Sequence, residues 1–93
     1  MTTVREGIAR RAQHNADTAT FGAIAEAQQK IADEVRDGTS KMKGLKEYGD
    51  WEVVDAEVKT GRSGVQYHRL VTIRAVVLFF PNAKYGAFLT VEE

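Results

Sequence analysis

Only two side chains in this 93-residue chain, His14 and His68, normally titrate near neutral pH. Neither lies in a cluster with the spacing of a metal site, and the chain has no cysteine that could add a thiolate ligand. His68 could act as a general base if Glu57, on a neighbouring strand, oriented it. A cross-strand pair on the surface explains the same two residues better. We therefore predict no catalytic histidine and no bound metal.

Two short motifs match fragments of catalytic or phosphate-binding sites. Ser40 and Lys43 form an S-x-x-K pattern, in which a lysine can activate a serine nucleophile, but the further motifs that such enzymes need are missing. The segment 61–64, Gly-Arg-Ser-Gly, resembles part of a phosphate-binding loop, but it joins two expected strands and precedes no helix. The sequence therefore predicts a protein that is not an enzyme and needs no cofactor.

Basic and aromatic side chains gather near the first expected hairpin, where they could stack bases and neutralise phosphates. They are Lys59, Arg62, Tyr67, His68, Arg69 and Arg74. Glu52, Asp55 and Glu57 dilute this charge, and the chain as a whole has 13 basic and 13 acidic residues, so its formal net charge is zero. A small nucleic-acid-binding regulator is therefore the alternative function rather than the leading one.

Length and composition favour one small domain, with 43% hydrophobic and 28% charged residues, as in soluble globular proteins. The first residues lack the apolar segment of a signal peptide. The longest uninterrupted apolar run, residues 75–81, is too short to span a bilayer. We expect a protein of the cytoplasm or of the interior of a virion, with no membrane partner.

Residues 1–37 are expected to be helical. Thr3 and Glu6 fit a capping box at the start, and Gly38 suits a left-handed cap at the end. The stronger apolar stripe lies in the second half, where residues recur at spacings of 3 and 4: Phe21, Ile24, Gln28, Ile31 and Val35. Two alternatives stay open, namely one continuous helix or two helices hinged near residue 17, where several residues could cap a new helix.

Residues 38–50 are expected to form a linker and residues 51–93 a sheet of three strands, 51–59, 65–80 and 84–92. A four-residue first loop would pair Val58 with Tyr67 and Glu57 with His68, and a three-residue second loop would pair Phe79 with Tyr85. One face of the long middle strand is apolar except for Arg69 and should face the core. The predicted fold is α+β, with the helical stripe packed on a three-stranded antiparallel meander.

The second face of the middle strand becomes fully apolar towards its end. With the third strand it gives a cluster that we predict to be a partner interface: Val76, Leu78, Phe80, Tyr85 and Phe88. Soluble monomers rarely leave a contiguous patch of this size bare without a use for it. We therefore expect a non-enzymatic interaction protein that contacts a second copy of itself, another protein, or both. An oligomeric assembly subunit or a small inhibitor, of the kind that phages encode, would fit.

Overall fold

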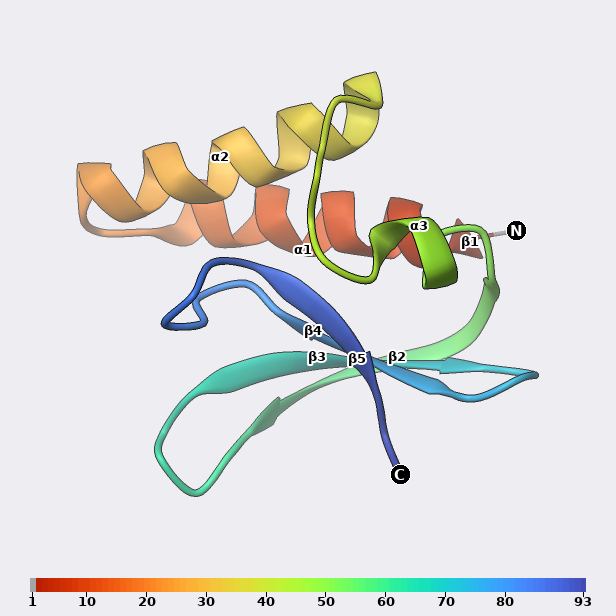
Figure 1. Ribbon diagram of the computed structural model, residues 1–93. Helices are drawn as coiled ribbons and strands as arrows, with labels where there is room; N and C mark the ends of the chain where they lie inside the picture. Colours follow the sequence, from red (N-terminus) through yellow and green to blue (C-terminus); the bar gives the residue numbers. More distant parts are fainter. Residues whose placement is uncertain (1) are drawn as a thin grey trace.

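The structure is a computed structural model that describes residues 2–93, and it places a pair of helices on one face of an antiparallel sheet (Figure 1). The elements are β1 (Thr2–Thr3), α1 (Val4–Thr18), α2 (Gly22–Asp37), α3 (Leu45–Tyr48), β2 (Glu52–Thr60), β3 (Gln66–Thr72), β4 (Val76–Phe80) and β5 (Phe88–Val91). The strands follow one another in the sheet in the order of the chain. The predicted α+β class is confirmed, but the three-stranded meander is wrong, because the sheet has five strands.

The helical region consists of two helices, which is the second of the two alternatives. Thr3 caps α1 as predicted, since the backbone N–H of Glu6 donates to Thr3 Oγ1 at 3.2 Å. The helix stops at Ala19, whose backbone is extended, so the break falls just after the expected hinge at residue 17. Gly38 ends α2 with a left-handed φ of 81°, also as predicted.

The first helix, not the second, supplies most of the helical side of the core. Val4, Ile8 and Ala12 of α1 are completely buried, because α1 lies against the strands and α2 packs on α1. The predicted stripe of α2 reaches this core only with its last turns, through Ile31 and Val35, whereas Phe21 is 69% exposed. The expectation that the whole stripe packs on the sheet is therefore wrong.

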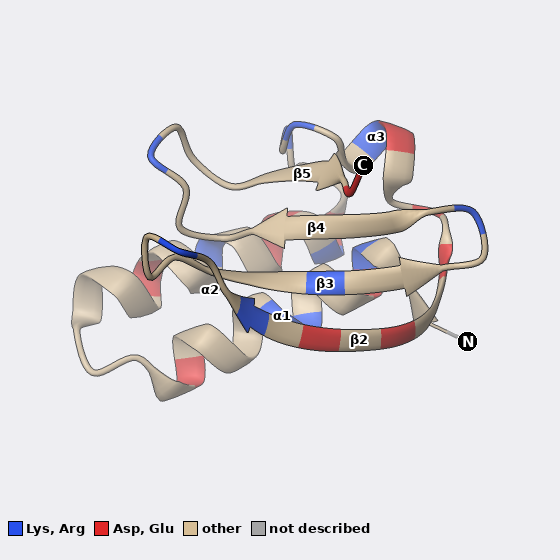
Figure 2. Ribbon diagram, turned by 90° about the horizontal axis from the view of Figure 1, so that it is seen from below, with Lys and Arg blue, Asp and Glu red and all other residues tan. Residues whose placement is uncertain are grey.

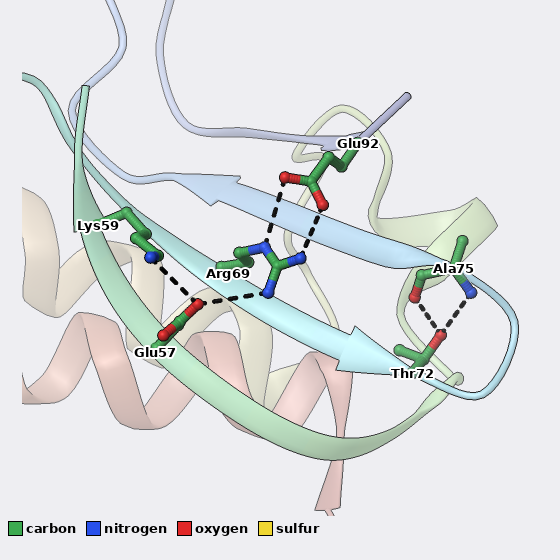
Figure 3. Close-up of polar contacts among 6 residues, drawn as sticks. All are labelled: Glu57, Lys59, Arg69, Thr72, Ala75 and Glu92. Carbon is green, nitrogen blue, oxygen red and sulfur yellow. Dashed lines mark hydrogen bonds and ion pairs between the residues drawn. The ribbon is translucent and has the colours of Figure 1, made fainter. Parts of the chain in front are cut away.

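The expected middle strand is two strands, β3 and β4, joined by a turn at residues 73–75. The hydroxyl of Thr72 closes this turn: Oγ1 donates to the carbonyl oxygen of Ala75 at 2.5 Å and accepts the backbone N–H of Ala75 at 3.0 Å (Figure 3). It also accepts the backbone N–H of Arg74 at 3.2 Å. A side chain that bonds nearby backbone groups can terminate a strand without glycine or proline.

This turn reverses which side chains of β3 face the helices. His68, Leu70 and Thr72 point inward and are buried, so the predicted inner face of β3, with Tyr67, Arg69 and Val71, faces outward instead. In β4 the prediction holds, since Val77 and Phe79 are completely buried in the core.

The residue pairing differs from the prediction both between β2 and β3 and between β4 and β5. Val58 pairs with His68 rather than Tyr67, and the register of β2 shifts between Val53 and Asp55. Phe79 pairs with Leu89 rather than Tyr85, because the loop between β4 and β5 spans residues 81–87. The third predicted strand, 84–92, accordingly shortens to β5.

The linker covers one edge of the sheet. It contains the single turn α3, whose Leu45 is buried in the core. Lys43 forms a parallel bridge to Phe88 of β5, and the backbone N–H of Leu89 donates to the carbonyl oxygen of Lys43 at 2.8 Å. Gly44 follows with a φ of 90°, in close contact with Leu89. The edge of β5 is therefore partly occupied, whereas β1 pairs with β2 at only two positions.

Candidate functional site

The sheet face turned away from the helices is covered by no element of residues 2–93 (Figure 2). We call it the outer face and define it by the outward side chains of β2–β5 and of the residue after β5: Asp55, Glu57, Lys59, Tyr67, Arg69, Val71, Val76, Leu78, Phe80, Phe88, Thr90 and Glu92. Strand pairing aligns these residues in rows that run across the sheet.

One row is aromatic. The ring centroids of Tyr67 and Phe80 are 5.2 Å apart at an interplanar angle of 27°, and those of Phe80 and Phe88 are 4.9 Å apart at 13°. Stacking at these distances fixes the rings against one another and leaves each of them half-buried. The row forms an ordered apolar border at the end of the outer face nearest the β2–β3 turn.

Aliphatic side chains continue the apolar surface from this row. Val71, Val76 and Leu78 lie next to one another and are all half-buried. Four of the five residues predicted as a partner interface, Val76, Leu78, Phe80 and Phe88, are therefore brought together on the outer face. The fifth, Tyr85, lies apart in the loop 81–87 and is 91% exposed.

A charged cluster lies at the centre of the outer face (Figure 3). The guanidinium of Arg69 donates to Glu92 with Nη2–Oε2 at 2.9 Å and Nε–Oε1 at 3.4 Å, and Arg69 Nη1 lies 3.3 Å from Glu57 Oε1. Lys59 Nζ is 3.6 Å from the same Glu57 oxygen. The hydrogen bond from Arg69 lowers the pKa of Glu92 and raises the pKa of Arg69 itself. Two carboxylates therefore compensate this arginine.

The structure separates the six residues of the alternative nucleic-acid surface. Lys59, Tyr67 and Arg69 lie on the outer face, but His68 faces the helices, so its expected pairing with Glu57 is wrong and Glu57 pairs with Arg69 instead. Arg62 belongs to the β2–β3 turn and Arg74 to the β3–β4 turn, at opposite ends of β3.

Arg74 has an aromatic partner within the chain. Its guanidinium lies 4.6 Å from the ring centroid of Trp51, in a cation–π contact. Trp51 in turn meets Tyr48 edge to face, with ring centroids 5.1 Å apart. This group holds the linker and the β3–β4 turn together, so its aromatic rings are engaged in structure.

A groove on the other side of the sheet escaped the sequence analysis. It consists of two adjoining cavities, of about 380 and 200 Å³, which share Arg11 and His68. The larger lies between α1 and β2, and the smaller is lined mainly by α1, β3 and the loop after β4 and reaches β2 only at Val58. The inner side chains of β2 remain exposed there, and Val58 is 41% exposed. The alternation of Val54, Ala56 and Val58 marked an apolar side of this strand, but only the position of α1 shows that this side is left uncovered.

His68 is the titratable residue with a shifted pKa in this groove, and it lines both cavities. Burial disfavours its charged form, and the positive charge of Arg11 acts in the same direction, so the pKa of His68 falls to about 4. Its ring is therefore neutral at pH 7. His68 Nδ1 is buried, and no atom of residues 2–93 hydrogen-bonds to it.

The remaining motifs have structural roles. Ser40 Oγ accepts the backbone N–H of Met42 at 3.3 Å, which places it in a local turn. In segment 61–64 the N–H of Gly61 donates to Val65 and that of Gly64 to Gly61, so the segment closes the β2–β3 hairpin. Within residues 2–93, three or more histidine, aspartate or glutamate side chains nowhere gather as a metal site would require.

No helix formed by the described residues combines the length and the apolar character needed to cross a membrane. The chain was also compared with protein families, curated proteins and solved structures, and none of these three comparisons found a match.

Proposed function

We propose that this protein is not an enzyme but works by protein–protein contact, and that its outer face packs against the outer face of a second copy. The observation that carries the proposal is the uncovered row of Tyr67, Phe80 and Phe88, continued by Val71, Val76 and Leu78. The helices cover the opposite side of the sheet, and no helix or loop of residues 2–93 covers this side (Figures 1 and 2). An assembly subunit or a small inhibitor would use such a surface.

The size of the outer face supports a specific but reversible contact. Four strands about 4.8 Å apart and three side-chain rows about 6.8 Å apart give roughly 400 Å². Six of the twelve side chains on this face are apolar, so about half of that area, roughly 200 Å², is apolar. The whole face is about half of what one partner contributes to a standard stable interface. The contact should therefore depend on protein concentration.

The charges of the outer face favour a protein over a nucleic acid. Two basic side chains, Lys59 and Arg69, face three acidic ones, Asp55, Glu57 and Glu92. Both basic side chains already contact carboxylates. A polyanion would meet repulsion at this face. A second copy presents the same arrangement, in which carboxylates flank Arg69. Across a twofold axis, Arg69 of one copy can therefore lie opposite a carboxylate of the other, as a self-complementary interface requires.

Light scattering during size-exclusion chromatography tests the proposal. The wild type should give a mass that rises with concentration towards a dimer, and Leu78→Asp or Phe88→Asp should leave a monomer, because a carboxylate would be buried at the contact. Ile73→Asp is the matched control: Ile73 is 84% exposed in the β3–β4 turn, so this change should leave association intact.

Circular dichroism should show that each variant is folded. A wild type that stays monomeric up to its solubility limit would overturn the proposal. So would a dimer that persists in both outer-face variants. Salt-sensitive binding of single-stranded nucleic acid, lost on Arg69→Ala, would favour the alternative function instead.

A further inference from the structure

The α1–β2 groove, defined by the two cavities that share Arg11 and His68, lies on the helix side of the sheet, away from the outer face. One cavity extends towards Gly7 and Ala56, and the other towards Asn15 and Val58. The groove therefore has α1 as one wall and borders β2 at residues 53–56 and again at Val58.

The edge of β2 that borders this groove is open. β1 pairs only with Val53 and Glu52, and no other strand of residues 2–93 lies beyond β2. The hydrogen bond from Gly61 N–H to the carbonyl oxygen of Val65 fixes which residues point towards β3. By the alternation of an antiparallel ladder, the N–H and C=O groups of Ala56, Val58 and Thr60 then point away from the sheet.

Apolar side chains border the open edge. Val54 is 58% exposed, and Val58 and Ala56 are also exposed on the helix side of β2, because α1 does not cover them. An open strand edge with exposed apolar side chains is a template for pairing with another strand. Proteins that bind peptides by strand addition use such an edge for affinity and neighbouring pockets for selectivity.

The opposite wall is basic. Arg10, Arg11 and His14 of α1 line the groove, and Asp55 of β2 is the one acidic residue among those that line it. Neither arginine forms an ion pair with any carboxylate of residues 2–93, and Arg10 Nη1 lies 3.3 Å from Thr2 Oγ1. On the floor of the groove lies His68 of β3, more than nine-tenths buried, with its Nδ1 unpaired among residues 2–93. The groove thus offers positive charge and one unused polar atom beside an apolar strand.

We propose that the α1–β2 groove binds an extended segment of another protein, with acidic and aliphatic side chains, which adds to β2 as a further strand. Its backbone pairs with Ala56, Val58 and Thr60. Its aliphatic side chains pack on the exposed apolar residues of β2, and its carboxylates meet Arg10 and Arg11. This site lies apart from the outer face, so it adds a second contact to the proposed function and fails or stands independently of it.

The charges distinguish this occupant from a second copy. A second β2 strand brings its own α1 wall, which would set two sets of Arg10 and Arg11 side by side, with Asp55 as the only acidic residue lining each groove. A nucleic acid is disfavoured because the groove is lined mainly by aliphatic and polar side chains and by a single aromatic residue, Tyr67, whose ring stacks on Phe80.

Fluorescence anisotropy with a labelled peptide tests the site. The probe has the order Val-Val-Glu-Glu-Val-Val-Glu-Glu, about the length of one strand, so both of its faces carry aliphatic and acidic side chains. It should bind saturably. The same peptide with lysine in place of glutamate should not bind, nor should a version N-methylated at every residue, because neither of its edges can then donate to β2.

Variants locate the binding. Arg10→Glu and Arg11→Glu should each weaken binding of the peptide, with a Kd that rises about tenfold or more. Val58→Pro removes an N–H group that points to the open edge of β2 and makes no hydrogen bond to β3. This change should abolish binding of the peptide. Arg62→Glu, an identical charge change in the exposed β2–β3 turn, should leave the affinity unchanged.

The proposal is overturned if the lysine peptide binds as well as the glutamate peptide, or if Arg62→Glu weakens binding as much as both groove variants. It is also overturned if a single-stranded RNA displaces the peptide more strongly than unlabelled peptide does. Loss of self-association in Val58→Pro without any peptide binding would assign the edge to a second copy instead. Because Leu78→Asp leaves the groove intact, a monomeric Leu78→Asp protein that still binds the peptide separates the two sites.

Discussion

The side-chain amide of Gln28 donates a hydrogen bond of 2.7 Å to Asn82 Oδ1, across 54 positions of the chain. Gln28 Oε1 in turn accepts from Asn15 Nδ2 at 3.2 Å. These three amides connect α1, α2 and the loop after β4, and Gln28 is almost completely buried. A buried amide of this kind must keep its partners, since an unpaired polar group in the interior is unfavourable.

Replacing this amide should destabilise the fold. Gln28→Leu leaves Asn15 and Asn82 without their shared partner, and we expect the free energy of unfolding to fall by about 1–3 kcal/mol. Urea denaturation measures this change. Glu26→Leu, an exposed change on the same helix, serves as control and should have little effect. An unchanged or higher stability for Gln28→Leu would contradict the role given to this residue.

Two isoleucines on the two helices should respond very differently to the same truncation. Ile8 of α1 is completely buried, whereas Ile24 of α2 is 46% exposed. Ile8→Ala should lower the free energy of unfolding by about 2–5 kcal/mol, as for buried large-to-small changes, and Ile24→Ala by less than about 1 kcal/mol. The apolar stripe of α2 alone would suggest the reverse order, so thermal unfolding of both variants distinguishes the two packings.

The depressed pKa of His68 makes stability depend on pH. The unfolded chain binds a proton at this residue below about pH 6.5, but the folded chain does so only below about pH 4. Stability is therefore complete above pH 6.5 and falls as the pH drops towards 4, by about 2 kcal/mol between pH 7 and pH 5.

Urea denaturation at the two pH values should show this loss in the wild type and in His14→Gln, whose histidine lies exposed on α1. His68→Leu should remove most of it, because the buried site then has no group to protonate. If His68→Leu lost as much stability as the wild type between pH 7 and pH 5, the pH dependence would come from other groups.

The two left-handed glycines of the linker should differ in their tolerance of a side chain. A Cβ added at Gly44 would lie 2.7 Å from the carbonyl oxygen of Leu89 and 2.8 Å from its Cβ, whereas one added at Gly38 would meet no atom within 4 Å. Gly38→Ala should therefore lose only the conformational term of about 1–2 kcal/mol. Gly44→Ala should lose clearly more, because β5 would have to shift. Equal thermal shifts for both would show that the linker can move away from β5.

Local signals in the sequence predicted the parts of the fold that depend on neighbouring residues. The cap at Thr3 and the left-handed end at Gly38 are confirmed because each depends on one residue type and a few backbone groups. The α+β class followed from the change between helical and alternating periodicity. Four of the five interface residues also come to lie on one face, since β4 kept its expected alternation.

The misplaced elements depended on tertiary context. The turn after Thr72 has no glycine or proline, and its β-branched neighbours have high strand propensity, so a single strand was expected. The second face of the expected strand carries both polar and apolar residues up to Arg74 and only apolar residues after it. This change in composition was the signal of two strands. Small residues made the core position of α1 hard to predict, because Gly7 and Ala12 contribute little to an apolar periodicity. They allow α1 to approach β3 closely: a Cβ added to Gly7 would lie 3.3 Å from the side chain of Leu70.

The two-residue strand β1 has a practical consequence for any experiment on this chain. Thr2 and Thr3 already pair with β2, so a tag or fusion partner joined ahead of them starts beside the open part of the same edge. Such an appendage would be present there at a local concentration on the order of millimolar, enough to compete with a weak ligand. A label attached after Glu93 avoids this competition, and a comparison of the two placements would itself report how accessible the edge is.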